Sequence, residues 1–118
     1  MVGKGERNVF GQVPALHQVQ SEAGVSGGLH VALLGGALAT TFTSSQGLLL
    51  MIPNMNKIAG EMLPITLNNR TRAIGQQAQS IYCEYSDAIA VRSTGWCLMA
   101  SITVQEAQDL AAICHLSA

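Results

Sequence analysis

The hydrophobic and polar positions of this chain predict short extended segments that alternate with helices. We expect strands or extended chain at residues 16–21, 38–42, 65–68 and 88–91. Helical segments are expected at 23–39, from Gln46 onward, at 55–61, at 75–82, and from Thr103 towards Leu116. The alternation indicates βαβ units, and therefore an α/β fold with three layers: a mostly parallel sheet with helices on both faces.

Local sequence signals place the ends of several of these elements. Thr43, Ser44 and Ser45 offer N-caps for the helix near Gln46, and Thr103 with Glu106 forms a capping-box pattern. Proline has no backbone N–H and clashes with the preceding turn, so Pro53 is expected to kink or end its helix.

Polar residues follow the predicted strands at the ends where a parallel sheet binds ligands. Glu22, Thr43 with Ser44, residues 69–72, and Arg92 with Ser93 all fall at such positions. Ligands of open α/β sheets collect beyond the carboxyl ends of the strands. We therefore expect these residues to gather at one edge of the sheet.

Composition limits the class of protein and its partners. The 118 residues suffice for one domain, and with 48% hydrophobic and only 11% charged residues much of its surface should meet another surface. The net charge of −1, without charge runs, disfavours binding to nucleic acid or to an anionic membrane. The N-terminus lacks the apolar core of a signal peptide, which favours a cytoplasmic location.

The three cysteines show no spacing typical of a disulfide framework, a zinc site or an iron–sulfur site. Cys83, Cys97 and Cys114 are odd in number and contain no C-x-x-C pair. We expect them to be small buried hydrophobic residues in a reducing compartment. The histidines also lack metal-ligand spacing, so no metal ligand is assigned.

Glu22 is the strongest candidate for chemistry among the acidic residues. It stands where the apolar segment from Val13 to Val19 ends and a glycine-rich stretch begins, with no lysine or arginine near it in the sequence. Burial there would disfavour its charged form. A carboxyl group that shares a proton is suited to acid–base work.

The chain resembles a known family along nearly its whole length. The matching motifs include Gln18 to Gly24, with Ser21-Glu22-Ala23-Gly24 at its end, and then residues 40–55, 57–61, 92–95, 104–106 and 109–111. They are similar to the N-terminal domain of pyruvate:ferredoxin (flavodoxin) oxidoreductase, the thiamine-diphosphate domain that holds the aminopyrimidine. By this resemblance residues 1–8 are a polar lead-in and 9–118 a partial pyrimidine-binding domain.

The resemblance implies roles for four residues. The glutamate matching Glu22 hydrogen-bonds the aminopyrimidine ring nitrogen and favours the imino tautomer that activates the cofactor. Arg72 matches the arginine that faces the pyruvate carboxylate, a role suited to a planar and permanently charged group. Thr43 and Ser44 would lie beside the cofactor, although helix capping explains them equally well.

The complete enzyme implied by the resemblance oxidatively decarboxylates pyruvate to acetyl-CoA. It uses thiamine diphosphate and passes electrons through iron–sulfur clusters to ferredoxin or flavodoxin, and it is a dimer. A diphosphate-binding domain or subunit with magnesium and the cluster-binding cysteine motifs are not found in these 118 residues. We therefore expect a fragment or split subunit that is inactive alone.

Two alternative functions are considered. The first is a non-catalytic, oxidoreductase-like structural domain, as in relatives associated with sulfite reductase. The second is a hydrolase, because Gly24-Val25-Ser26-Gly27-Gly28 fits the nucleophile-elbow pattern, with Asp87 or Asp109 and then His115 following. The hydrolase is disfavoured because Asp109 and His115 would lie on separated faces of one helix.

Overall fold

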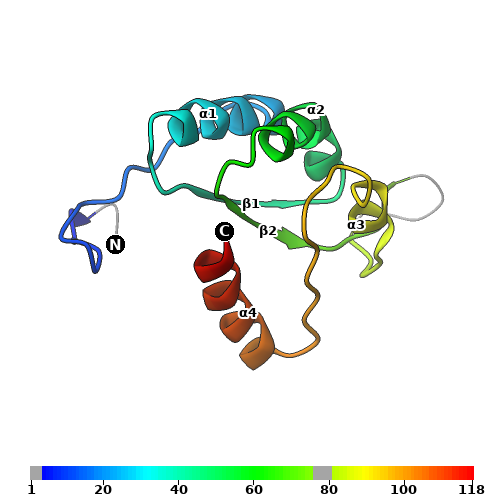
Figure 1. The fold of residues 1–118 in the computed structure, drawn as a ribbon. Helices are drawn as coiled ribbons and strands as arrows, with labels where there is room; N and C mark the ends of the chain where they lie inside the picture. The colour runs from blue at the N-terminus through cyan, green and yellow to red at the C-terminus, as the bar shows by residue number, and fades with distance from the viewer. Residues whose placement is uncertain (1–3, 76–80) are drawn as a thin grey trace.

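A computed structural model describes residues 4–75 and 81–118 of the chain. Helices and strands alternate between residues 22 and 90, and one further helix follows (Figure 1). Their order is α1 (Glu22–Leu34), β1 (Thr40–Ser44), α2 (Gln46–Gly60), β2 (Thr66–Arg70), α3 (Ser86–Ala90) and α4 (Val104–Ser117). The predicted α/β class is thereby confirmed.

The two strands form a parallel pair that α2 connects as a βαβ unit. Their register pairs Thr40 with Thr66 at one end and Ser44 with Arg70 at the other. In Figure 1, α1 and α2 lie together on one side of the strands, and α4 lies on the other side. Because parallel strands run the same way, both carboxyl ends meet at one edge.

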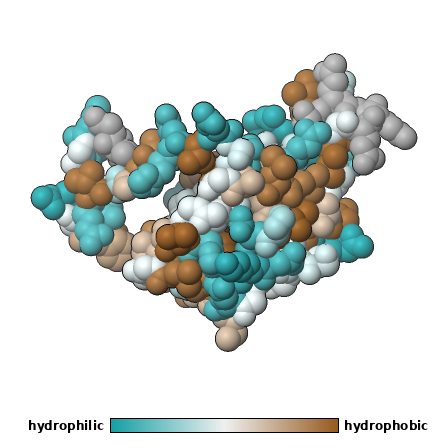
Figure 2. Space-filling model, turned by 90° about the horizontal axis from the view of Figure 1, so that it is seen from above, coloured by the Kyte–Doolittle hydropathy of each residue, from teal (hydrophilic) through white to brown (hydrophobic). Residues whose placement is uncertain are grey.

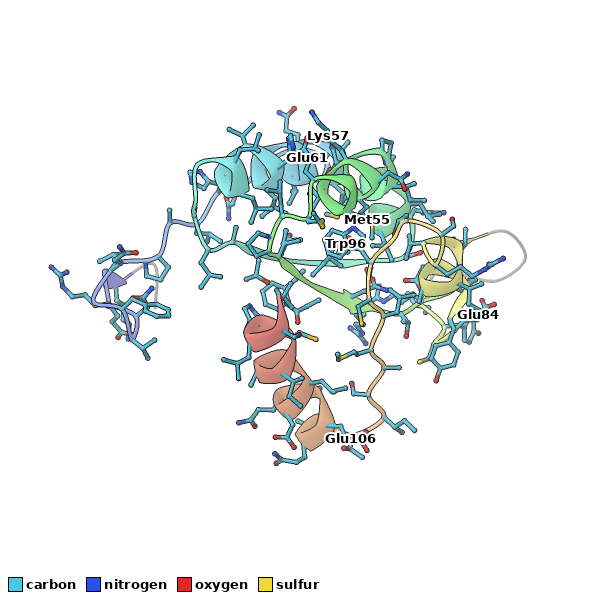
Figure 3. The ribbon with its side chains drawn as sticks, in the orientation of Figure 1. Met55, Lys57, Glu61, Glu84, Trp96 and Glu106 are labelled. Carbon is cyan, nitrogen blue, oxygen red and sulfur yellow. The ribbon has the colours of Figure 1, made fainter. Side chains whose placement is uncertain are left out.

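The core lies beneath α2. Leu48, Met51, Met55 and Val91 form a buried apolar cluster, and the half-buried Trp96 packs against it. The indole Nε1 of Trp96 donates a hydrogen bond to the Met55 carbonyl oxygen at 2.9 Å (Figure 3). Burial of this helix face ties the loop after α3 to α2.

Two predicted helix ends differ from the structure. The helix expected at 23–39 ends at Leu34, since Gly36 adopts φ +78°, a left-handed conformation that suits glycine. Pro53 does not end its helix, because α2 runs without interruption from Gln46 to Gly60. The second piece expected at 55–61 belongs to this same helix, whose buried face of Leu48, Met51 and Met55 compensates for the missing hydrogen bond.

Two segments predicted as strand or extended chain form no strand. Residues 16–21 form no strand, and Leu16 and Val19 are exposed without a partner strand. Residues 88–91 overlap the helix α3 rather than a strand, because such a short apolar run carries no reliable period. The helix predicted at 75–82 falls mainly on 76–80, outside the described residues, while Ile81 and Tyr82 are not helical.

The cysteines differ from the prediction in their exposure. Cys83 and Cys97 are exposed and Cys114 is half-buried, so none of them is a core residue. All three are free thiols. Among residues 4–75 and 81–118, no helix is both long enough and apolar enough to span a membrane.

Candidate functional site

The predicted polar edge of the sheet forms where β1 and β2 end. Arg92 and Ser93, which were expected at a strand end, instead follow the helix α3. Thr43 is paired with Asn69, and Ser44 with Arg70, at the last two positions of the register. Glu22 reaches the same region because α1 begins with it, after Ser21, whose Oγ accepts a hydrogen bond from the Gly24 N–H at 3.3 Å. The edge therefore brings together residues from three separate elements.

Gly47 shows how closely Glu22 and Thr43 approach one another. A Cβ atom at position 47 would lie 2.9 Å from Glu22 Oε1 and Cγ, and 2.8 Å from Thr43 Oγ1. These distances are shorter than normal contacts, so only glycine fits there without displacing a side chain. The sequence reading missed Gly47, although its place just after the turn that follows β1 was a usable signal.

One of the polar atoms around Gly47 lacks a hydrogen-bond partner. Thr43 Oγ1 is buried and has no hydrogen-bond partner among the described residues. Buried polar groups are rarely left without partners. A half-buried carboxylate, an unpartnered hydroxyl and a glycine backbone therefore lie next to one another at this edge. Ser44, the other predicted cofactor residue, is also half-buried here.

Arg72 lies just beyond the end of β2, and its guanidinium forms no salt bridge with a carboxylate in the described part of the chain. Its Nε atom is buried without a hydrogen bond. The salt bridge found among the described residues joins His30 and Glu61 instead, at 2.6 Å. An arginine that is partly buried and unpaired is poised to bind an anion, because its fork of donors matches a carboxylate.

Asp87 is the most deeply buried polar side chain of this region, with an exposed fraction of 0%. Its Oδ2 accepts hydrogen bonds from the Ser45 N–H, the Asn69 side-chain amide and the Arg72 N–H. Sequence reasoning considered Asp87 only as a hydrolase acid. Asp87 stands before a short apolar run in the sequence, and nothing in that pattern indicated that its carboxylate would accept these hydrogen bonds.

The structure does not support the hydrolase. Ser26 is buried in α1, where its Oγ donates to the Ala23 carbonyl and accepts from the Asn54 side chain. His115 Nδ1 contacts the Ala111 carbonyl within its own helix. Asp109 accepts from Gln105 on the same helix. These groups form no triad in the described residues.

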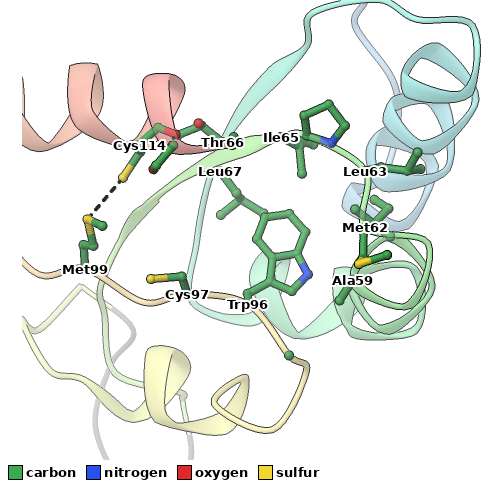
Figure 4. A pocket seen from close by; sticks show the side chains of 15 residues that line it. Ala59, Met62, Leu63, Ile65, Thr66, Leu67, Trp96, Cys97, Met99 and Cys114 are labelled. Carbon is green, nitrogen blue, oxygen red and sulfur yellow. Dashed lines mark hydrogen bonds between the residues drawn. The ribbon is translucent and has the colours of Figure 1, made fainter.

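A pocket with a mixed polar and apolar lining lies apart from this edge. It has a volume of about 390 Å³ and is formed by the end of α2, β2, the Trp96 loop and α4. Figure 4 shows the Trp96 ring among Ala59, Met62 and Leu67, with Met99 and Cys114 at its far side. None of the four predicted site residues lines it. In residues 4–75 and 81–118, no three His, Cys, Asp or Glu side chains gather as a metal site.

The chain matches one protein family over its full length. The family described as pyruvate flavodoxin/ferredoxin oxidoreductase, thiamine diphosphate-binding, matches residues 1–118. A pyruvate:ferredoxin oxidoreductase of Moorella thermoacetica is 50% identical over 113 residues, which are 96% of this chain and 10% of that protein. The mitochondrial pyruvate dehydrogenase [NADP(+)] of Euglena gracilis is 51% identical over 98% of this chain and 6% of its own length.

A shorter relative gives the same result. A pyruvate-flavodoxin oxidoreductase of a Nostoc species is 51% identical over 110 residues, or 93% of this chain and 27% of that protein. The chain therefore spans only a small part of the curated relatives that it matches. Their names concern proteins with much more sequence than these 118 residues.

Proposed function

Because the chain belongs to the thiamine-diphosphate-binding domain family of pyruvate flavodoxin/ferredoxin oxidoreductases, we propose that it forms the pyrimidine-binding part of a 2-oxo-acid oxidoreductase. The whole enzyme would oxidatively decarboxylate pyruvate to acetyl-CoA. The observation that carries this proposal is the meeting of Glu22 and the unpartnered Thr43 hydroxyl at Gly47.

Glu22 and Thr43 would bind the aminopyrimidine ring. The Glu22 carboxyl group would share a proton with a ring nitrogen, and Thr43 Oγ1 would gain the hydrogen bond that it lacks. Ser44, the next residue of β1, would also lie beside the cofactor. When bound, thiamine diphosphate supplies the electron sink for cleaving the bond between the carbonyl and carboxylate carbons.

Arg72 would orient the 2-oxo acid. Its guanidinium has no carboxylate among the described residues, and its buried Nε lacks a partner. A substrate carboxylate would satisfy these donors in a bidentate geometry. Holding the substrate in one orientation is itself a large part of catalysis.

The remaining parts of the enzyme would come from sequence beyond these 118 residues or from another chain. We place there the domain that holds the diphosphate through magnesium, the iron–sulfur clusters and the contacts with coenzyme A. Ferredoxin or flavodoxin would accept the electrons, and the complete enzyme would be a dimer. Further strands would extend the β1–β2 pair into a three-layer domain, and the free thiols favour a reducing, cytoplasmic location.

The test compares Glu22→Gln with the native protein in the full-length protein, complete with its remaining parts, whether these lie on the same polypeptide as this chain or on another. We expect thiamine diphosphate still to bind, while exchange of its thiazolium C2 proton with deuterium slows by at least about 10²-fold. Glu84→Gln, which changes an exposed glutamate in the same way, should exchange at the native rate. Equal exchange in all three proteins would remove Glu22 from cofactor activation. A lack of binding in all three would support the non-catalytic structural domain.

A further inference from the structure

Asp87 is a fully buried carboxylate to which the proposed function assigns no role. It lies in α3, a helix of five residues, and its side chain accepts every hydrogen bond that it makes. The donors to Oδ2 are Ser45 N at 2.9 Å, Asn69 Nδ2 at 3.1 Å and Arg72 N at 3.2 Å. Its Oδ1 accepts from Ala88 N at 2.7 Å.

These donors belong to the segments that build the two halves of the site. Ser45 is the N-cap of α2, two residues before the glycine that touches Glu22 and Thr43. Asn69 is near the end of β2, and Arg72 follows that strand. One carboxylate oxygen thus connects the cofactor side of the edge with the arginine side.

A buried carboxylate without a cation depends on such donors. No lysine or arginine side chain forms a salt bridge with Asp87 in the described part of the chain. Removing a carboxylate from water is unfavourable unless hydrogen bonds replace its hydration. Conformations of the Arg72 segment that keep the hydrogen bonds to Asp87 are therefore strongly favoured over open conformations that break them.

The backbone at Ser45 shows that this junction is held in an unusual conformation. Ser45 has φ 52° and ψ −130°, which a residue with a Cβ rarely adopts. The Ser45 N–H bond to Asp87 and the Ser45 Oγ bond to the Ala73 carbonyl, at 2.9 Å, hold it there. The Ser45 hydroxyl is thus used to fix the Arg72 segment rather than to cap α2, which has no side-chain cap.

We propose that Asp87 is a positioning residue that fixes the Arg72 segment against the β1–α2 junction, so that the guanidinium points to the substrate site. Asp87 does not touch cofactor or substrate in this role, and it acts through the backbone of Arg72 and the side chain of Asn69. The inference rests on the proposed role of Arg72 in binding the 2-oxo acid.

The test is Asp87→Asn in the full-length polypeptide, assayed with pyruvate. The Asn oxygen still accepts from the donors at Oδ2, but its amide nitrogen then faces the Ala88 N–H, so the segment shifts without losing every bond. We expect KM for pyruvate to rise about tenfold with kcat changed less than about threefold, because a displaced Arg72 would hold the substrate carboxylate less tightly in the ground state and in the transition state alike. The rate of thiazolium C2-proton exchange should stay at the native value.

Val91→Ala is the matched control for a loss of stability alone. Val91 is buried at the end of α3 and packs in the core cluster, but it makes no side-chain hydrogen bond to the Arg72 segment. We expect Val91→Ala to lower the melting temperature and to leave KM for pyruvate unchanged. A native KM in Asp87→Asn, or an equal rise in both variants, would overturn the positioning role.

Arg72→Ala separates failure of this inference from failure of the proposed function. A large rise in KM for Arg72→Ala with a native KM for Asp87→Asn would overturn the role of Asp87 alone. An unchanged KM for Arg72→Ala would overturn the substrate role of the arginine, and the inference with it. If Asp87→Asn fails to fold, Asn69→Ala decides: a rise in KM of about threefold supports the inference, and a native KM overturns it.

Discussion

The contact of Glu22 and Thr43 at position 47 depends on one missing methyl group. A Cβ on residue 47 would lie within 3 Å of the Glu22 carboxyl oxygen and the Thr43 hydroxyl. The Glu22 carboxyl is at the end of a flexible side chain, so it would move while the backbone stays in place. The single residue most sensitive to substitution at this edge is therefore a glycine inside a helix.

Gly47→Ala is expected to weaken thiamine diphosphate binding by at least about tenfold, or about 1.4 kcal/mol, in the full-length polypeptide. The protein should still fold, because alanine favours helix over glycine by up to about 1 kcal/mol. Calorimetric titration with the cofactor and magnesium measures the change. Gly60→Ala is the control in the same helix, since a Cβ there meets nothing within 4 Å. Native affinity in Gly47→Ala would show that the cofactor does not occupy this contact.

At the scale of elements, α4 depends on its own caps more than on packing. None of its residues is buried. The Glu106 carboxylate, at the start of the helix (Figure 3), accepts hydrogen bonds from the Ile102 and Thr103 N–H groups at 2.9 and 3.1 Å. These hydrogen bonds lower the pKa of Glu106 below its ordinary value of 4.5, and the bond from the Ile102 N–H has the largest effect.

The start of α4 should therefore lose stability on acidification. A carboxyl group whose pKa is lower in the folded state stabilises that state above the unfolded pKa, and this contribution is lost as the pH falls through the folded pKa. We expect the Ile102 and Thr103 amides to lose protection from hydrogen exchange as the pH falls below about 4.5. Glu106→Gln should lack this dependence, whereas Asp109→Asn, outside the capping box, should keep it. Identical profiles in all three proteins would contradict the assignment.

Pro53 tests how far packing overrides local preference in α2. Proline lacks the N–H that would bond the carbonyl of Leu49, yet the helix continues through it. We expect Pro53→Ala to raise the local free energy of opening of α2 by about 1 to 3 kcal/mol, measured by amide hydrogen exchange. Asn56→Ala, on an exposed position of the same helix, should change it by less than about 0.7 kcal/mol. Equal changes in the opening free energy for Pro53→Ala and Asn56→Ala would mean that the proline does not destabilise α2.

Sequence patterns predicted the elements whose signals are local. The capping box at Thr103 and the strands β1 and β2 were placed to within a few residues, and Glu22, Thr43 and Ser44 were expected at the edge where they lie. What could not be predicted depends on contacts between distant segments. Pro53 remains helical because of core packing, and residues 88–91 are not a strand because Asp87 fixes the short helix α3 through Ser45 and Arg72.

At the scale of the whole molecule, a large share of the apolar side chains remains at the surface. Phe42 in β1 is 78% exposed, and Leu116 in α4 is 89% exposed. Figure 2 shows hydrophobic groups in brown on the face seen from above, beside hydrophilic ones in teal. In the described residues β1 and β2 pair only with each other, so each strand has a free edge. Such edges and apolar patches are surfaces on which other protein segments pack.

The 118-residue chain produced alone should consequently associate with itself. We expect light scattering to give a mass above 12.4 kDa that rises with concentration, together with strong binding of a hydrophobic fluorescent dye.

Phe42→Thr combined with Leu116→Lys should reduce both signals, because these changes remove apolar area from the free strand and from α4. A core variant such as Leu48→Thr would not serve this test, because Leu48 is buried and its loss would unfold the core. The complete enzyme of the proposed function should bind far less dye per mole, because its other parts would cover these surfaces. A native chain that stays at 12.4 kDa at all concentrations and binds no dye would show that its exposed apolar side chains are not an interface.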